Sequence, residues 1–133
     1  MYEVLCNEEL VGMYYLFLNE DLVYLSYICV REEDKGKSYG TKILQHIHED
    51  YSDYRFVVDI EEVKENDDNY EEERRRRAFY LKNGYESTGV FYRIFGVDYE
   101  LLSYNGKVSK EDWHALILNN WGRVAGRARY ETR

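Results

Sequence analysis

The chain has 133 residues, 44% of them hydrophobic, which is enough to form the core of one domain. Its formal net charge of −8 excludes the class of proteins that hold nucleic acid through clustered lysines and arginines, so no nucleic-acid partner is expected. Two cysteines are too few for a disulfide framework, and the three histidines lack the spacing of a metal site. Without a bilayer-length apolar run or a leader pattern, we expect a cytoplasmic protein with no membrane partner.

Three β-rich segments begin the chain, at residues 2–6, 10–18 and 22–30, and short polar turns separate them. Residues 22–30 are almost continuously apolar or aromatic, which is typical of a strand covered on both faces. The three segments therefore predict an antiparallel meander whose third strand is central.

Helical and strand patterns then alternate. Residues 41–51 carry apolar side chains at helical spacing, and residues 56–60 predict a short buried strand. A second helix is expected over residues 71–83, because acidic residues begin it and Gly84 stands where a left-handed cap would follow. This order predicts an α/β domain built on one mixed sheet, in the α+β sense.

The last part of the chain predicts a strand pair and a helix. Residues 85–95 and 97–104 read as the two strands, and a capping box precedes a helix with one apolar stripe. That helix either covers the exposed sheet or docks on a second subunit. The basic tail, residues 122–133, is expected to fray. We divide the chain into a core over residues 1–108 and a carboxy-terminal helix and tail over residues 109–133.

The polar turn between the third strand and the first helix is a candidate anion site. A helix N-terminus offers free N–H donors and a partial positive charge. Gly36 and Gly40 let the backbone come close to a ligand, and Lys35 and Lys37 add positive charge. The turn lacks the spacing of a P-loop. On these residues alone, an ordinary glycine-containing connection is an equal alternative.

This turn resembles the [Q/R]-x-x-G-x-[G/A] signature of the GNAT superfamily of N-acetyltransferases. In the stretch K-G-K-S-Y-G, Lys35 replaces Gln or Arg, Ser38 replaces the middle glycine, and Gly40 matches. The resemblance implies that backbone amides here hold the pyrophosphate of acetyl-CoA, while the preceding strand end pairs with the pantetheine arm. The binding residues it implies are Ile28, Cys29, Val30, Lys35, Gly36, Lys37, Ser38, Tyr39, Gly40 and Thr41.

A second stretch, F-Y-L-K-N-G-Y at residues 79–85, resembles the family's other signature at a helix end. The resemblance implies that Tyr80 is the general acid that protonates the leaving CoA thiolate. The alternative is a core tyrosine at a helix C-terminus. Together the two signatures imply a GNAT-type acyl-CoA N-acyltransferase fold of a bacterial type over residues 2–103. By this resemblance the fold lacks the usual amino-terminal strand and helices, which in the family build one wall of the acceptor pocket.

Carboxylates follow the predicted strand at residues 56–60. Asp59 and Glu61 are two residues apart and share one face of that strand. Glu61 is the candidate general base, with a solvated strand-end carboxylate as the alternative. A wider acidic rim would attract a cationic amine, and its members are Glu61, Glu62, Glu65, Asp67 and Asp68.

The basic run at residues 74–77 has two interpretations. It could meet a phosphate of CoA, or it could pair on an exposed helix face with the glutamates at residues 71–73, which lie three and four positions away. The pairing interpretation is the stronger one.

We therefore predict an N-acetyltransferase that moves an acetyl group from acetyl-CoA to a primary amine of a small molecule or peptide. The amine attacks directly in a ternary complex, no metal takes part, and the acceptor is expected to be cationic. A homodimer is also allowed for. The alternative is a CoA-binding module with little or no catalysis that acts as a sensor or assembly subunit. In a third interpretation, the turn binds nothing and the chain is a plain interaction protein.

Overall fold

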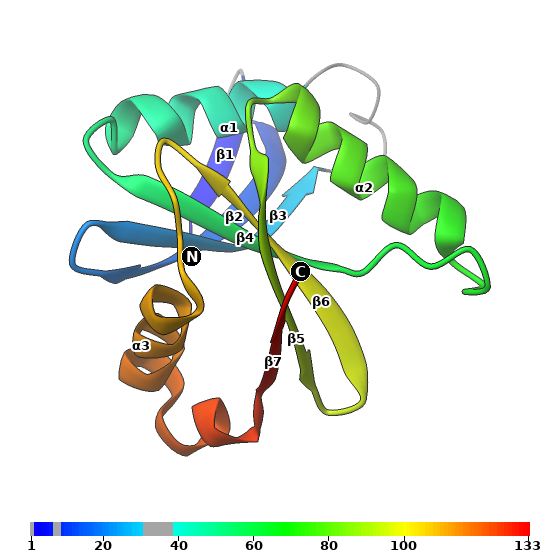
Figure 1. The fold of residues 1–133 in the computed structure, drawn as a ribbon. Coiled ribbons are helices and arrows are strands. Elements are labelled where there is room, and N and C mark those ends of the chain that lie inside the picture. The colour runs from blue at the N-terminus through cyan, green and yellow to red at the C-terminus, as the bar shows by residue number, and fades with distance from the viewer. Residues whose placement is uncertain (1, 7–8, 31–38) are drawn as a thin grey trace.

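A mixed sheet with helices on both faces makes up the fold (Figure 1). The computed structural model describes residues 2–6, 9–30 and 39–133. The seven strands have the spatial order β1-β2-β3-β4-β6-β5-β7, and only β3 and β4 pair in parallel. The strands are β1 (Tyr2–Cys6), β2 (Glu9–Asn19), β3 (Leu22–Val30), β4 (Arg55–Glu61), β5 (Glu86–Ile94), β6 (Val97–Tyr104) and β7 (Arg129–Thr132).

The described residues also form three α-helices and one short 3-10 helix: α1 (Tyr39–Asp50), α2 (Tyr70–Lys82), α3 (Lys110–Trp121) and η2 (Gly122–Arg127). The predicted order of elements from β1 to α3, and the mixed α+β sheet, are confirmed. Within the residues that the structure describes, no helix has both the length and the apolar character needed to cross a bilayer.

The helices divide the core into two layers. On one face, α1 buries its apolar stripe (Ile43, Leu44 and Ile47), and α2 contributes Tyr80 to the same cluster. On the other face, α3 buries Trp113 and packs against the sheet. β3 serves both layers, because alternate residues of a strand point to opposite faces. The prediction that this strand is covered on both sides is confirmed for residues 22–25.

The end of α2 has the cap that Gly84 predicts. Gly84 adopts a positive φ of 92°, and its N–H donates to the carbonyl of Leu81 at 3.2 Å. The next N–H, from Tyr85, donates to the carbonyl of Tyr80 at 3.0 Å. This pair of bonds is a Schellman motif, and it turns the chain directly into β5.

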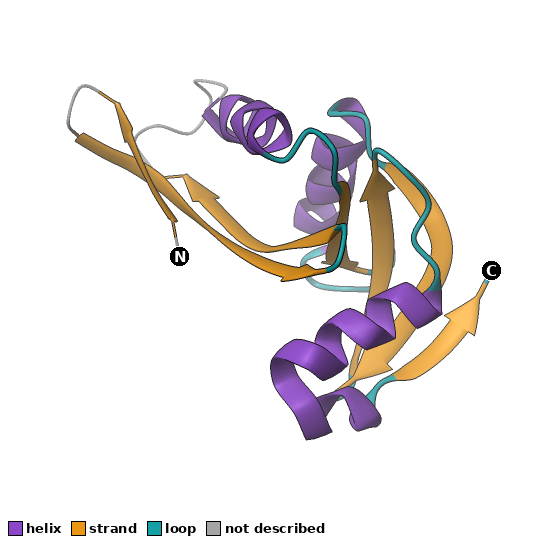
Figure 2. Cartoon of the chain, turned by 90° about the vertical axis from the view of Figure 1, so that its left-hand side faces the viewer, coloured by secondary structure: helices purple, strands orange, loops and turns teal. Residues whose placement is uncertain are grey.

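α3 begins with the predicted capping box, in which the Ser109 side chain accepts from the N–H of Asp112 at 3.1 Å and the Asp112 carboxylate accepts from the N–H of Ser109 at 3.2 Å. Figure 2 shows α3 on the side of the sheet opposite α1 and α2. Of the two interpretations of this helix, the structure therefore supports the one in which it covers the chain's own sheet.

The prediction that the basic tail frays is wrong for residues 129–132. They form β7, which pairs antiparallel with β5 from Val90↔Thr132 to Arg93↔Arg129. The guanidinium of Arg133 then lies 4.0 Å from the centre of the Phe91 ring. A strand of four residues with charged side chains has too short an alternation to stand out in the sequence. The sheet thus extends into the segment that composition alone marks as a tail.

Candidate active site

The ladder between β3 and β4 stops part of the way along both strands. Parallel pairing runs only from Leu22↔Arg55 to Tyr24↔Val57. Beyond that point β3 stays paired with β2, and β4 stays paired with β6 through Glu61. The arm formed by β1, β2 and β3 therefore diverges from the rest of the sheet (Figure 2). We call the opening between the second halves of β3 and β4 the wedge. The predicted contact residues Ile28, Cys29 and Val30 lie along its β3 edge.

A β-bulge in β3 marks the start of the wedge. The register with β2 passes from Tyr15↔Tyr27 to Leu16↔Leu25, so Ser26 has no partner of its own. An extra residue in one strand bends it and interrupts pairing, which accounts for the departure of β3 from β4 after Tyr24. No local pattern in the sequence indicates the bulge.

The N-terminus of α1 lies at the same end of the wedge. The unit β3–α1–β4 is a parallel crossover, so α1 begins beyond the carboxyl end of β3, where such units bind ligands. The first turn of α1 contains no acidic residue that would oppose an anion. Tyr39, Gly40 and Thr41 belong to this turn. The other predicted members of the turn lie outside the described residues, and they are Lys35, Gly36, Lys37 and Ser38.

The two signature segments meet at Gly40. A Cβ atom on this residue would lie 3.2 Å from both Cε1 and Cζ of Phe79 in α2. The sequence predicts that Gly40 lets the backbone approach a ligand, whereas in the structure its missing side chain leaves room for the Phe79 ring. This close approach places the N-terminus of α1 beside the turn of α2 that carries Tyr80.

Tyr80 lies in the core with only 6% of its surface exposed. Its ring packs at 5.2 Å from the rings of Phe79 and Tyr85. Burial raises the pKa of Tyr80 to about 12, Arg76 opposes this rise, and the charge of Asp59 adds to it. The hydroxyl makes no hydrogen bond to another residue in the described part of the chain. Tyr80 is thus a core tyrosine whose phenol is protonated at neutral pH and has a proton to donate.

Asp59 lies on the opposite face of β4, toward α3. Its carboxylate accepts hydrogen bonds from Tyr24 Oη at 2.6 Å and from Tyr92 Oη at 2.5 Å. Burial raises the pKa of Asp59, and the two hydroxyl bonds partly offset that rise. Burial and the charge of Asp59 also raise the pKa of both phenols. Sequence reasoning finds Asp59 but misses Tyr24 and Tyr92, because they come from β3 and β5 and share no local spacing with it.

Glu61, the predicted general base, lies at the end of β4, opposite Tyr99 of β6. It is half-buried, and the side-chain amide of Asn69 donates to its carboxylate at 3.4 Å. Its role as a base stays a prediction.

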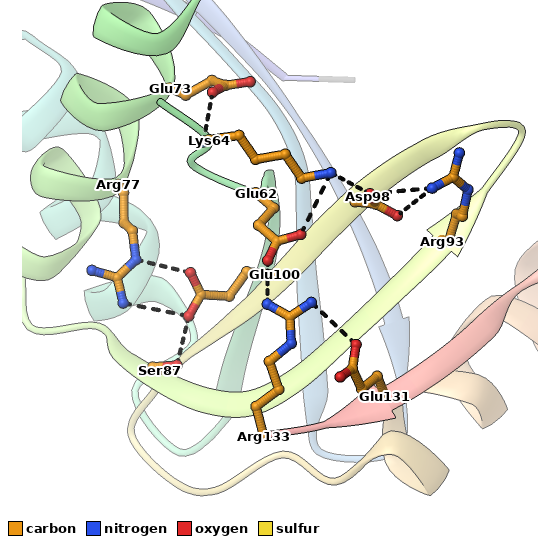
Figure 3. A network of polar contacts seen from close by, with 10 residues as sticks. All are labelled: Glu62, Lys64, Glu73, Arg77, Ser87, Arg93, Asp98, Glu100, Glu131 and Arg133. Carbon is orange, nitrogen blue, oxygen red and sulfur yellow. Dashed lines mark hydrogen bonds and ion pairs between the residues drawn. The ribbon is translucent and has the colours of Figure 1, made fainter. Parts of the chain in front are cut away.

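One member of the predicted acidic rim is already paired with cations. Glu62 accepts a hydrogen bond from the guanidinium of Arg133 and lies 3.9 Å from Lys64 Nζ (Figure 3). Lys64 in turn binds Asp98, which ties the loop after β4 to β6. Glu62 therefore adds little to the attraction of a cationic acceptor, and the remaining members of the rim are Glu61, Glu65, Asp67 and Asp68. In the described ranges, no three His, Cys, Asp or Glu side chains gather so that they could hold a metal ion.

The basic run of α2 pairs within the protein, as the stronger of its two interpretations predicts. Arg74 reaches Glu71 at 2.7 Å and Arg76 reaches Glu72 at 3.6 Å, both on the exposed helix surface. Arg77 instead crosses to β6, where its Nε donates to the buried carboxylate of Glu100 at 2.8 Å (Figure 3). The hydroxyl of Ser87 donates to the other oxygen of that carboxylate at 2.6 Å.

The burial of Glu100 and the exposure of Glu71 predict that substitutions at these two residues destabilise the protein to different extents. Glu100→Gln should lower the free energy of unfolding by about 1–3 kcal/mol, because it weakens buried, charge-assisted hydrogen bonds and leaves Arg77 without its counter-charge. Glu71→Gln is the matched control and should cost about 0.5 kcal/mol or less, since it breaks an exposed pair of the same helix. Urea denaturation of the two variants measures both changes. Equal losses would contradict the assigned difference in burial.

The comparisons with known proteins agree with this geometry. A family model described as an acetyltransferase (GNAT) domain matches residues 2–87. A GNAT-family protein from Bacteroides thetaiotaomicron superposes with a TM-score of 0.70 at 16% identity, over 90% of this chain and 71% of its own. The ribosomal-protein-S18-alanine N-acetyltransferase from Escherichia coli gives a TM-score of 0.61 at 13% identity, over 83% and 70%. A Bacillus subtilis acetyltransferase in complex with CoA gives 0.60 at 15%, over 75% and 72%. No curated protein sequence matches the chain.

Proposed function

The chain belongs to the GNAT acetyltransferase family, and we propose that it transfers the acetyl group of acetyl-CoA to a primary amine of a small molecule or peptide. The amine attacks the thioester directly in a ternary complex. The observation that carries this proposal is the wedge, because a sheet that opens between two parallel strands beside a helix N-terminus offers one continuous site for a long, anionic thioester.

The residues around the wedge suit the donor. Along residues 25–30, the β3 edge that faces the wedge is not paired with β4. An extended pantetheine arm can add to this edge as a strand would. The N-terminus of α1 favours the pyrophosphate, since its free N–H groups carry partial positive charge. The CoA complex of the Bacillus subtilis relative supports CoA as the donor.

The chemistry needs few groups from the protein. The amine nitrogen attacks the thioester carbon, the C–S bond breaks, and the thiolate that leaves requires a proton. The protonated phenol of Tyr80, which has no hydrogen-bond partner among the described residues, can supply that proton. The carboxylates near the wedge, Glu61 foremost, attract a cationic acceptor and exclude an anionic one.

Calorimetric titration with acetyl-CoA, followed by a thiol-release assay with a panel of primary amines, tests this proposal. We expect micromolar binding and amine-dependent release of CoA. Binding without release for every amine would instead support the CoA-binding module that acts as a sensor. The absence of binding at millimolar acetyl-CoA would contradict the donor site itself.

A further inference from the structure

We infer that Tyr24, Asp59 and Tyr92 form the acceptor site for an alkylammonium group, and that Tyr24 relays a proton from the amine to Asp59. This inference rests on the proposed function, because it concerns the same wedge seen from its other face.

The position of Tyr24 is the first support. It is the last residue of β3 that pairs with β4, and its partner is Val57. Asp59 lies two residues further along β4, where β3 no longer pairs with it, and the Tyr24 hydroxyl donates to it across the two strands at 2.6 Å. The phenol therefore lies where the wedge begins.

The two faces of the sheet give the second support. Tyr80 packs with α1 on one face, and the Tyr24–Asp59–Tyr92 cluster lies with α3 on the other. The two groups border the same stretch of β4, because Val58 and Ile60 pack in the cluster of Tyr80 while Asp59, between them, bonds to Tyr24 and Tyr92 on the other face. A donor bound on the α1 face leaves the α3 face for the nucleophile. The wedge thus has an acid on one side and a base on the other.

The third support is the charge of Asp59. Both side chains that donate hydrogen bonds to it are phenols, Tyr24 of β3 and Tyr92 of β5. In the described part of the chain, no Lys, Arg or His forms an ion pair with it, so its ionised form has no counter-cation there. A poorly solvated carboxylate without a cation is costly, and an ammonium ligand would supply that cation.

Aromatic rings make the same cluster suitable for an organic cation. Tyr92 and Tyr99 stack with their centres 5.0 Å apart and their planes 17° from parallel. Tyr99 is half-buried and pairs with Glu61, two residues beyond Asp59 on β4. Ring faces attract alkylammonium groups, and a carboxylate next to them adds charge and a hydrogen-bond acceptor.

The proton step balances within this cluster. An N–H bond of the bound ammonium breaks and its proton passes to Tyr24 Oη, while the original hydroxyl proton of Tyr24 passes to Asp59 Oδ1. The products are a neutral amine, an intact phenol and a protonated Asp59. The amine then attacks the thioester, and its second proton reaches the thiolate by way of Tyr80. Asp59 returns its proton to solvent after the product leaves.

The pH dependence of acetyl transfer to 2-phenylethylamine tests the relay. The lysine side chain has a pKa of about 10.4, so at pH 7.4 about one amine of this kind in a thousand is already neutral. With the relay, wild-type kcat/KM should change little between pH 7 and 9, because the ammonium form is itself the substrate. Asp59→Asn should react only through the neutral amine. Its kcat/KM should fall by about 10²- to 10³-fold at pH 7.4 and rise about tenfold per pH unit. A loss that is equal at every pH would overturn the relay.

Two phenol variants form a matched pair, since each removes one hydrogen bond from Asp59. Tyr24→Phe should reproduce the steep pH dependence of Asp59→Asn, because it interrupts the relay. Tyr92→Phe should lower the rate less and keep the wild-type profile. Thermal melts confirm that each variant folds. Identical profiles for the two variants would remove the special role of Tyr24.

Binding distinguishes the failure of this inference from the failure of the proposed function. Calorimetry in the presence of CoA should detect 2-phenylethylamine but not its neutral analogue, 2-phenylethanol, and Asp59→Asn should lose most of the amine binding. If wild type binds the amine in this way but releases no thiol, the ammonium site stands and the proposed transfer fails for this amine. If wild type and Asp59→Asn bind the amine equally, the inference is wrong whether or not the enzyme turns over.

Discussion

Tyr80→Phe is expected to lower kcat for acetyl transfer about 10²-fold and to leave the affinity for acetyl-CoA nearly unchanged. The change removes one oxygen atom from a ring that is already held in the core, so the shape of the wedge is preserved. The proton for the departing thiolate is lost. Because burial raises the pKa of Tyr80 to about 12, the wild-type phenol stays protonated between pH 6 and about 10. The difference in kcat between wild type and the variant should therefore persist over this whole range.

A neighbouring phenol provides the control for this prediction. Tyr85 packs in the same cluster, but its hydroxyl is paired with His48 Nε2 at 3.0 Å. Tyr85→Phe makes the same chemical change without touching the proposed acid, so kcat should stay within about twofold of wild type, well short of the loss expected for a general acid. Steady-state thiol release gives kcat, and calorimetry gives the dissociation constant. A parallel loss of kcat and affinity in Tyr80→Phe would assign Tyr80 to binding instead.

The secondary structure around the proposed donor site is the part of the fold that the sequence predicts best. Its elements follow one another along the chain, from an almost continuously apolar strand through a polar turn to an amphipathic helix. Gly84 also predicts the end of α2 correctly, because a left-handed cap has a strong residue preference. Local sequence patterns therefore predict the elements from β3 to the end of α2, the helix that carries Tyr80.

The cluster proposed as the acceptor site could not be predicted in this way. Tyr24 and Tyr92 lie 35 and 33 positions from Asp59, and only the strand order β3-β4-β6-β5 brings the three together. The bulge at Ser26, which opens the wedge, has no residue signature of its own. The sequence therefore indicates carboxylates near the strand end, but it does not tell which of them is held between phenols.

Long-range pairing also changes the electrostatics. The sequence shows five acidic residues in the rim as equals, yet Glu62 is paired with Arg133, which lies 71 positions away. That pairing depends on β7, a strand whose four residues are too few to predict by alternation. Glu62, which the sequence groups with the residues that attract a substrate, instead holds the loop after β4 to the sheet.

Gly40→Val should weaken the binding of acetyl-CoA by about tenfold or more, through the packing of α1 on α2. A Cβ at this position already lies 3.2 Å from two atoms of the Phe79 ring, and the two methyl groups of valine extend further. Overpacking of this kind costs about 1–3 kcal/mol. Moving the Phe79 ring, and α2 with it, away from the N-terminus of α1 relieves that strain and separates the two segments that frame the proposed donor site. Gly126→Val is the control, because a Cβ at Gly126 meets no atom within 4 Å.

A double-mutant cycle separates this steric mechanism from direct contact with the ligand. If the Phe79 ring is the obstacle, Phe79→Ala should restore much of the affinity that Gly40→Val loses, and the two changes should be strongly non-additive. If valine instead meets the phosphates of CoA, removing the ring will not help and the two losses will add. Calorimetric affinities for the four proteins of the cycle decide between these mechanisms. Additive losses would place Gly40 against the ligand, as the sequence alone suggests, and would leave its closeness to Phe79 without a role in binding.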